Sequence, residues 1–188
     1  MLVFVLTVLS LAFLSIWVIP WWIRTYNNFQ VFYTKAERQF ADVDVVMQQR
    51  LDNIQTLAHS VKTYDGHEQQ VIRDAIEART HWSKDIPLNE KIALIPRIED
   101  AYLKLKALAE QYPNLKANEM HLNFMNTESL VETQLRQSRF NYNESAQEYN
   151  QRMRTFPSNI VATAHSLPRL KYIAFRAKAV FQPKELIA

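Results

Sequence analysis

A long apolar periodicity between residues 24 and 65, a stretch without glycine or proline, constrains the fold more than any other feature. Its apolar residues follow one another in alternating steps of four and three, which is the spacing of one face of an α-helix. A β-strand would need apolar and polar residues to alternate, and residues 48–53 do not. The pattern predicts one long helix, with Arg50 as the charged exception on a face made of Phe29, Tyr33, Ala36, Phe40, Val43, Met47, Ile54, Leu57, Val61 and Tyr64.

Three more helical patterns follow. The second helix is expected to start in a capping box of Asp65 and Glu68 and to end before Pro87, with an apolar stripe of Val71, Ile72, Ala75, Ile76 and Trp82. The third carries Pro96, where a kink is expected, and buries Ile98, Ala101, Tyr102, Leu105, Leu108 and Tyr112. The fourth runs from about residue 115 to residue 156 and presents Leu135, Arg139, Tyr142, Ala146, Tyr149, Met153 and Phe156.

Helices with one apolar face each must bury these faces against one another. Short connections favour neighbours that run in opposite directions, as in coiled-coil-like bundles. The sequence therefore predicts an all-α protein in which residues 24–156 form an antiparallel up-and-down four-helix bundle.

Residues 1–23 contain no charged side chain. As a helix they would extend roughly 34 Å, enough to cross a bilayer core. A cleaved signal peptide would need a basic start and a small-residue cleavage site, and neither is present. We predict a transmembrane anchor with Trp21 and Trp22 at the membrane interface. Because the basic residues Arg24, Lys35 and Arg38 follow the span, the N-terminus is expected outside and the bundle in the cytoplasm.

Composition excludes several functions. Gly66 is the sole glycine, and phosphate-binding loops of the P-loop and Rossmann types need several. The absence of cysteine excludes disulfides, thiolate catalysis and thiolate metal sites. A formal net charge of +3, spread over interleaved charges, argues against nucleic-acid binding.

Several segments resemble the LemA family: DVVMQQRLDNIQTL at 44–57, NLKANE at 114–119, and FPSNIVA at 156–162, together with Tyr142-Asn143 and Glu148-Tyr149-Asn150. The resemblance covers roughly residues 1–162. It implies a bacterial membrane protein with a four-helix bundle behind a single anchor, and it supplies no established activity. The chain departs from the family pattern where Ile54-Gln55-Thr56 replaces an Ile-Pro-Asn turn, and its C-terminal tail is longer and more basic.

No catalytic or metal-binding pattern is evident. The five histidines, His59, His67, His81, His121 and His165, show no pair at the i, i+4 spacing of a helical zinc site. The Glu-x-x-His pairs of a di-metal bundle are also missing from the sequence. We therefore expect no cofactor and no enzymatic activity.

Charged residues on the apolar seams are the remaining candidates. Counting along two helices that run in opposite directions places Arg50 level with Glu132 and Arg139 level with Asp44. A buried charge without a partner is costly, so these residues could pair and fix the register. Alternatively, their long side chains reach the rim of the bundle and shield the core.

Two functions follow from this reading. The first is a membrane-anchored scaffold or adaptor that contacts the lipid bilayer, envelope proteins or further copies of itself. The alternative is a ligand-binding or enzymatic bundle with a polar site around Asp44, Arg50, Glu132 and Arg139. An enclosed cavity there would favour the alternative, and a closely packed set of ion pairs would favour the scaffold.

Residues 157–188 form a basic tail. As a helix from residue 168 to 181, it would place Leu170, Ile173, Ala174, Ala177, Val180 and Phe181 on one side. Its basic residues Arg169, Lys171, Arg176 and Lys178 would lie outside that arc and could bind anionic lipid at the membrane surface. Alternatively, the apolar side caps the bundle.

Overall fold

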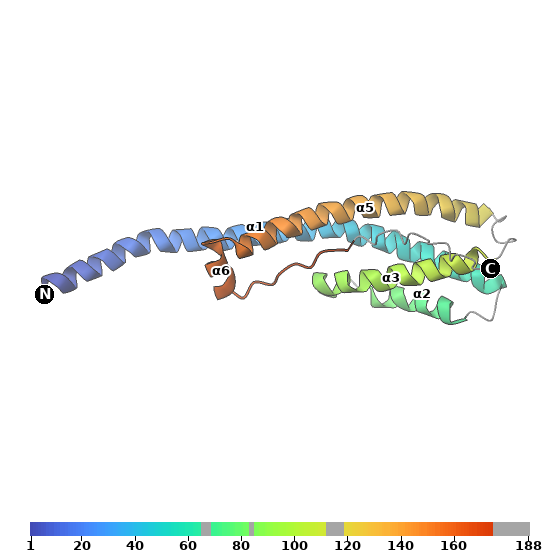
Figure 1. Ribbon diagram of the computed structural model, residues 1–188, viewed down its shortest axis with the longest axis horizontal. Coiled ribbons are helices and arrows are strands. Elements are labelled where there is room, and N and C mark those ends of the chain that lie inside the picture. The colour runs from blue at the N-terminus through green and yellow to red at the C-terminus, as the bar shows by residue number, and fades with distance from the viewer. Residues whose placement is uncertain (65–68, 83–84, 112–118, 175–188) are drawn as a thin grey trace, which may run out of the picture.

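The computed structural model describes residues 1–64, 69–82, 85–111 and 119–174. These residues form helices and no strand, which confirms the all-α class. The helices are α1 (Leu2–Tyr64), α2 (Gln69–His81), α3 (Leu88–Ala109), α5 (Glu119–Arg154) and the short α6 (Ser158–Ala164). Figure 1 shows α5 lying beside α1, with α2 and α3 along the C-terminal part of α1.

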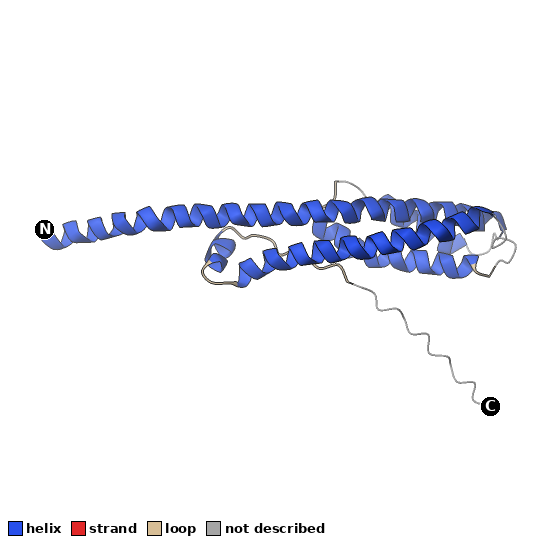
Figure 2. Cartoon of the chain, turned by 90° about the horizontal axis from the view of Figure 1, so that it is seen from above, coloured by secondary structure: helices blue, strands red, loops and turns tan. Residues whose placement is uncertain are grey.

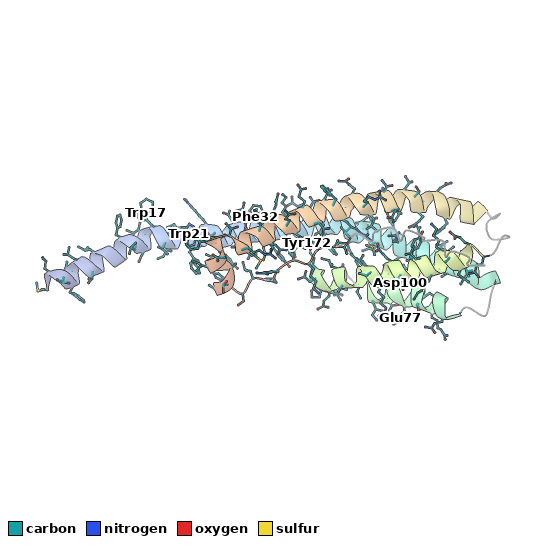
Figure 3. All side chains as sticks on the ribbon, in the orientation of Figure 1. Trp17, Trp21, Phe32, Glu77, Asp100 and Tyr172 are labelled. Carbon is teal, nitrogen blue, oxygen red and sulfur yellow. The ribbon has the colours of Figure 1, made fainter. Side chains whose placement is uncertain are left out.

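Helix α1 joins the apolar N-terminal segment to the long amphipathic stretch without interruption. Pro20 lies inside this helix, and no break separates residues 1–23 from the residues that follow. The N-terminal part projects beyond the other described helices, and Trp17 points away from them (Figures 2 and 3). Within the described residues, α1 is the one helix long and apolar enough to cross a membrane, which is consistent with an anchor.

The amphipathic part of α1 buries most of the face predicted from its periodicity, and the side chain of Tyr64 lies outside the described residues. Buried positions run from Phe29 to Val61 and include Arg50, while Tyr33 is partly buried. Ion pairs along α5 show the relative direction of the two helices: Lys35 pairs with Glu148, and Arg50 pairs with Glu132. Lower-numbered residues of α1 thus meet higher-numbered residues of α5. The complete up-and-down four-helix topology stays a prediction.

The other helices follow the predicted patterns with corrections at their ends. In α3 the predicted positions Ile98, Ala101, Tyr102, Leu105 and Leu108 are buried, and Pro96 lies inside the helix. Ile76 of α2 is exposed, contrary to prediction, because its side of α2 faces solvent. The predicted starts of the second and fourth helices lie outside the described residues, as does Tyr112, and so do the side chains of Val71, Ile72 and Ala75.

The end of the fourth helix also differs from the prediction. Helix α5 ends at Arg154, and Phe156 is exposed because the chain has already left the helical face at that point. The Phe156–Pro157 peptide bond is cis, and α6 follows it. The sequence analysis ended the fourth helix at residue 156, assigned residues 157–188 to a tail, and missed this helix.

A larger correction concerns the tail. Residues 167–174 are not helical but extended, and they run back along α5 (Figure 2). The predicted amphipathic helix is therefore wrong for its described half. Leu170 and Ile173, which were expected to face lipid or cap the bundle as part of a helix, are buried in the apolar core in extended conformation. Arg176 and Lys178 lie outside the described residues.

Candidate functional site

Five charged residues from three helices meet in the interior, and we call them the charge cluster: Arg50 of α1, Glu99 of α3, and Glu128, Glu132 and Arg139 of α5. Arg50 Nη2 donates to Glu128 Oε1 at 2.9 Å and to Glu132 Oε2 at 2.7 Å. Its Nη1 donates to Glu99 Oε1 at 3.4 Å, and Arg139 Nη2 donates to that same oxygen. Arg50 and Arg139 therefore share Glu99, and the cluster ties α3 to both long helices.

Most of the charge cluster is shielded from solvent. Arg50, Glu99, Glu128 and Arg139 are buried, whereas Glu132 is about half exposed. Burial by itself lowers the pKa of Arg50, but Glu128, Glu132 and Glu99 together outweigh it, and the pKa is raised. Arg50 thus stays charged at neutral pH.

An aromatic ring completes the surroundings of Arg50. The guanidinium carbon lies 4.7 Å from the centre of the Tyr102 ring, within the range of a cation–π contact. Burial, reinforced by the negative charge of Glu128, raises the pKa of the Tyr102 hydroxyl well above its usual value, although Arg50 opposes this shift. Tyr102 therefore stays neutral beside the ion pairs.

The cluster brings together part of the predicted set. Arg50 and Glu132 are paired, as their level positions suggested. Arg139 pairs with Glu99 of α3, a residue that the sequence analysis did not select. A signal for Glu99 existed, because Ile95, Glu99 and Tyr102 step by four and then three along the buried face of α3.

Asp44, which is partly buried, belongs to a separate ion pair. Its Oδ1 accepts hydrogen bonds from Lys91 Nζ at 3.0 Å and from Trp82 Nε1 at 2.8 Å. The ammonium group of Lys91, which is buried, lies 5.4 Å from the centre of the Trp82 ring. Asp44 therefore holds α3 and the residue after α2 against α1. The sequence analysis did not name Lys91, and it named Trp82 only as part of an apolar stripe.

In both arrangements the buried charges are paired with other side chains of the chain, although the charge cluster sets two arginines against three glutamates. Within the described ranges, no group of three or more histidine, aspartate or glutamate side chains is placed to hold a metal ion. His165 accepts a hydrogen bond from Trp22 Nε1 at 3.1 Å and packs against Tyr26, with ring centres 4.5 Å apart. His67 and the side chain of His121 lie outside the described residues.

The Trp22–His165 bond fixes the end of α6 beside α1 near residue 22. Trp21 packs edge-on against Trp22, with ring centres 6.4 Å apart. The chain then turns at Ser166, whose φ of 48° lies in the left-handed region, and enters the extended residues. A membrane-interface role for Trp21 and Trp22 stays a prediction.

Three asparagines hold residues 167–174, which we call the extended segment. Asn150 pairs with both the N–H and the C=O of Leu170, at 3.0 and 2.8 Å, and Asn143 does the same with Ile173, at 2.8 Å each. Asn89 of α3 donates to the carbonyl of Arg169 and accepts from the amide of Lys171, both at 2.9 Å. The side chains of Arg169 and Lys171 are thus exposed above a tightly bonded backbone, and their lipid-binding role stays a prediction.

A fourth side chain, that of Tyr142, also bonds to this segment. Its hydroxyl donates to the carbonyl of Lys171 at 2.9 Å. Burial, with smaller effects of Tyr33 and Tyr172, raises the pKa of Tyr142, so the hydroxyl keeps its proton and remains a donor. Asn143 and Asn150 stood within the motifs quoted in the sequence analysis, but their separation of seven residues was not interpreted there. That separation places both on one face of α5, two turns apart.

The family model of the LemA family matches residues 39–184. This range includes the charge cluster, the three asparagines and the extended segment. The chain belongs to the LemA family. It is also 27% identical over 124 residues to Protein LemA of Metamycoplasma hominis, an alignment that covers 65% of this chain. The alignment spans 53% of that relative, about half of its length. LemA is not a known enzyme family.

Proposed function

We propose that this LemA family protein is a scaffold or adaptor for envelope proteins, anchored by a single span in the cytoplasmic membrane. In this proposal α1, α2, α3 and α5 form an antiparallel four-helix bundle in the cytoplasm, and the N-terminus lies outside. The observation that carries the proposal is the continuity of α1. Its exposed apolar part leads without a break into a face buried against α5. Such a helix holds the bundle at a fixed distance and orientation from the bilayer.

The state of the buried charges supports a scaffold over the alternative of a ligand-binding or enzymatic bundle. Arg50, Glu132 and Arg139 are engaged in ion pairs with residues of the protein itself. Asp44 is paired with Lys91 in another place. Ion pairs of this kind favour a role in the register of the helices, whereas a ligand site needs polar groups aimed at an enclosed space. Single atoms of the cluster, Arg50 Nε, Arg139 Nε and Glu128 Oε2, are buried without a hydrogen-bond partner among the described residues.

The outer surface of α5 offers positions for contact with partners. Leu130 and Phe140 are large apolar side chains that the described fold leaves exposed. Exposed side chains of this kind are common singly, so only a direct test shows whether they contact a partner. The same helix carries exposed polar residues, Gln134 and Gln137, that serve as matched positions.

The experiment places a photo-reactive amino acid at Leu130 or Phe140 of the full chain in intact cells. We expect discrete protein adducts from these positions, and fewer from Gln134 and Gln137. Substituting the second apolar residue by aspartate in the same chain should remove the adducts. A chain that yields no protein adduct at any of the four positions would refute the scaffold role for this face.

A further inference from the structure

The extended segment is bound as a peptide ligand would be bound. Four of its carbonyl groups, from Arg169, Leu170, Lys171 and Ile173, accept hydrogen bonds from side chains of the helices. The amides of Leu170, Lys171 and Ile173 donate to side chains in the same way. We call the four side chains that make these bonds the asparagine seat: Asn89, Tyr142, Asn143 and Asn150.

Recognition by the asparagine seat depends little on sequence. An asparagine amide that bonds both the N–H and the C=O of one residue can do so with any residue except proline. Apolar selectivity comes from Leu170 and Ile173, which are buried three positions apart, while Arg169, Lys171 and Tyr172 are exposed. The seat therefore requires an extended backbone and two aliphatic side chains at positions i and i+3.

We propose that the asparagine seat is a binding site for an extended peptide of a partner protein, and that the chain's own residues 167–174 fill it as an internal ligand. The partner peptide has aliphatic residues at i and i+3 and a free amide at each. The proposal goes beyond the scaffold role and does not depend on membrane anchoring. It can be tested with the purified chain.

The bonding of the segment explains how it can be replaced. Among the described residues, the last backbone–backbone hydrogen bond before Arg169 joins the Leu167 amide to the Ala162 carbonyl. From Arg169 to Ile173 the backbone hydrogen bonds described above go to side chains of the asparagine seat. Another extended peptide can form the same bonds in the same geometry. Because the segment is tethered, its effective concentration is in the range of about 1 mM, and a competitor of equal intrinsic affinity must reach that concentration to displace half of it.

The first test uses the full chain with Leu170→Asp and Ile173→Asp, which expels the internal ligand. The probe is a fluorescent peptide with the sequence of residues 166–174. We expect saturable binding to this variant, at least about tenfold tighter than to the unaltered chain, whose tethered segment competes. A folded variant that does not bind the probe would refute the proposal.

Controls in the probe and in the protein separate the seat from non-specific adhesion. N-methylation of the probe at the positions of Leu170 and Ile173 removes the two amide donors and should abolish binding, whereas Tyr172→Ala in the probe should leave it unchanged. In the protein, Asn143→Leu should abolish binding, and Gln147→Leu, an exposed change on the same helix, should not. Equal binding of the methylated and unmethylated probes would contradict recognition through the backbone.

The second test does not require the variant to fold. Amide hydrogen exchange on the unaltered full chain compares Leu170 and Ile173 with the slowest amides of α5. We expect the two segment amides to exchange at least about tenfold faster, through release of the segment without unfolding of the helices. If they exchange at the rate of the slowest α5 amides, the segment leaves only on global unfolding, and it is part of the core and not a replaceable ligand.

Discussion

Replacing Arg50 by alanine tests whether the charge cluster stabilises the fold. Three carboxylates lose a partner, but they do not lose it equally. Glu99 keeps Arg139, and the side chain of Glu132, which is 47% exposed, can be hydrated. Glu128 is different, because its side chain is 7% exposed and its ion pair is with Arg50. One buried carboxylate is therefore stranded, which places the cost at the lower end of the range for a broken buried pair, about 3 kcal/mol.

The same reasoning predicts a rescue. Glu128→Gln removes the stranded charge while keeping the shape of the side chain. The double variant Arg50→Ala/Glu128→Gln should therefore be more stable than Arg50→Ala alone, with a coupling free energy of about 2 kcal/mol. The matching change Glu132→Gln should rescue much less, because Glu132 already reaches solvent.

Urea unfolding of the full chain in detergent micelles, followed by circular dichroism, provides the measurement. With an m value of about 2 kcal/mol per M, a loss of 3 kcal/mol lowers the midpoint by roughly 1.5 M. Arg79→Ala is the control, because Arg79 and Asp52 form an ion pair whose side chains are 49% and 62% exposed, and its removal should cost at most about 1 kcal/mol. If Arg50→Ala and Arg79→Ala shift the midpoint equally, the cluster does not stabilise the fold as a buried pair would.

Three further predictions follow from the other contacts. Asp44→Ala leaves the buried ammonium of Lys91 without its carboxylate and should lower the free energy of unfolding by about 3 kcal/mol. Adding Lys91→Met to this variant should restore part of the loss. A change below about 1 kcal/mol in Asp44→Ala alone would contradict the pairing. Burial, with a smaller effect of Tyr33, raises the pKa of Tyr149 to about 12. The unfolded chain therefore loses this proton near pH 10 while the folded chain keeps it, and the free energy of unfolding should fall between about pH 10 and 12. Tyr102 and Tyr142, whose pKa values are also raised, contribute to the same loss. Tyr149→Phe should therefore reduce this alkaline loss in urea titrations without abolishing it, and an unchanged slope would count against the assignment. Finally, protease added to intact spheroplasts should leave the bundle undigested, and cleavage between Arg24 and Thr155 without lysis would overturn the proposed orientation.

Sequence periodicity was sufficient to predict the long helix α1 and most of the buried positions of α1, α3 and α5. The steps of four and three in α1 depend only on helix geometry, so the buried positions from Phe29 to Val61 follow once the stretch is helical. Counting residues along two antiparallel helices also placed Arg50 opposite Glu132, because both helices rise by the same distance per residue. Ends of helices were less predictable, as the exposed Phe156 shows, since a helix end depends on local contacts.

The choice of partners among charged residues was decided by tertiary structure. Arg139 pairs with Glu99, and Asp44 pairs with Lys91, because α3 packs against α1 at a height and rotation that periodicity does not specify. Periodicity shows which residues lie on a face. It does not show which face of a third helix lies opposite.

The tail shows the limit of sequence patterns most clearly. Leu170 and Ile173 are three residues apart, a spacing that suits one side of a helix and was read as such. In the structure the same residues are extended, because Asn143 and Asn150 of α5 and Asn89 of α3 satisfy the backbone groups that a helix would otherwise pair within itself. A chain can leave helical conformation in a buried place only where such partners exist. The apolar pattern was therefore determined by the sequence, and the conformation of residues 167–174 by side chains far away in the chain that only the folded protein brings to them.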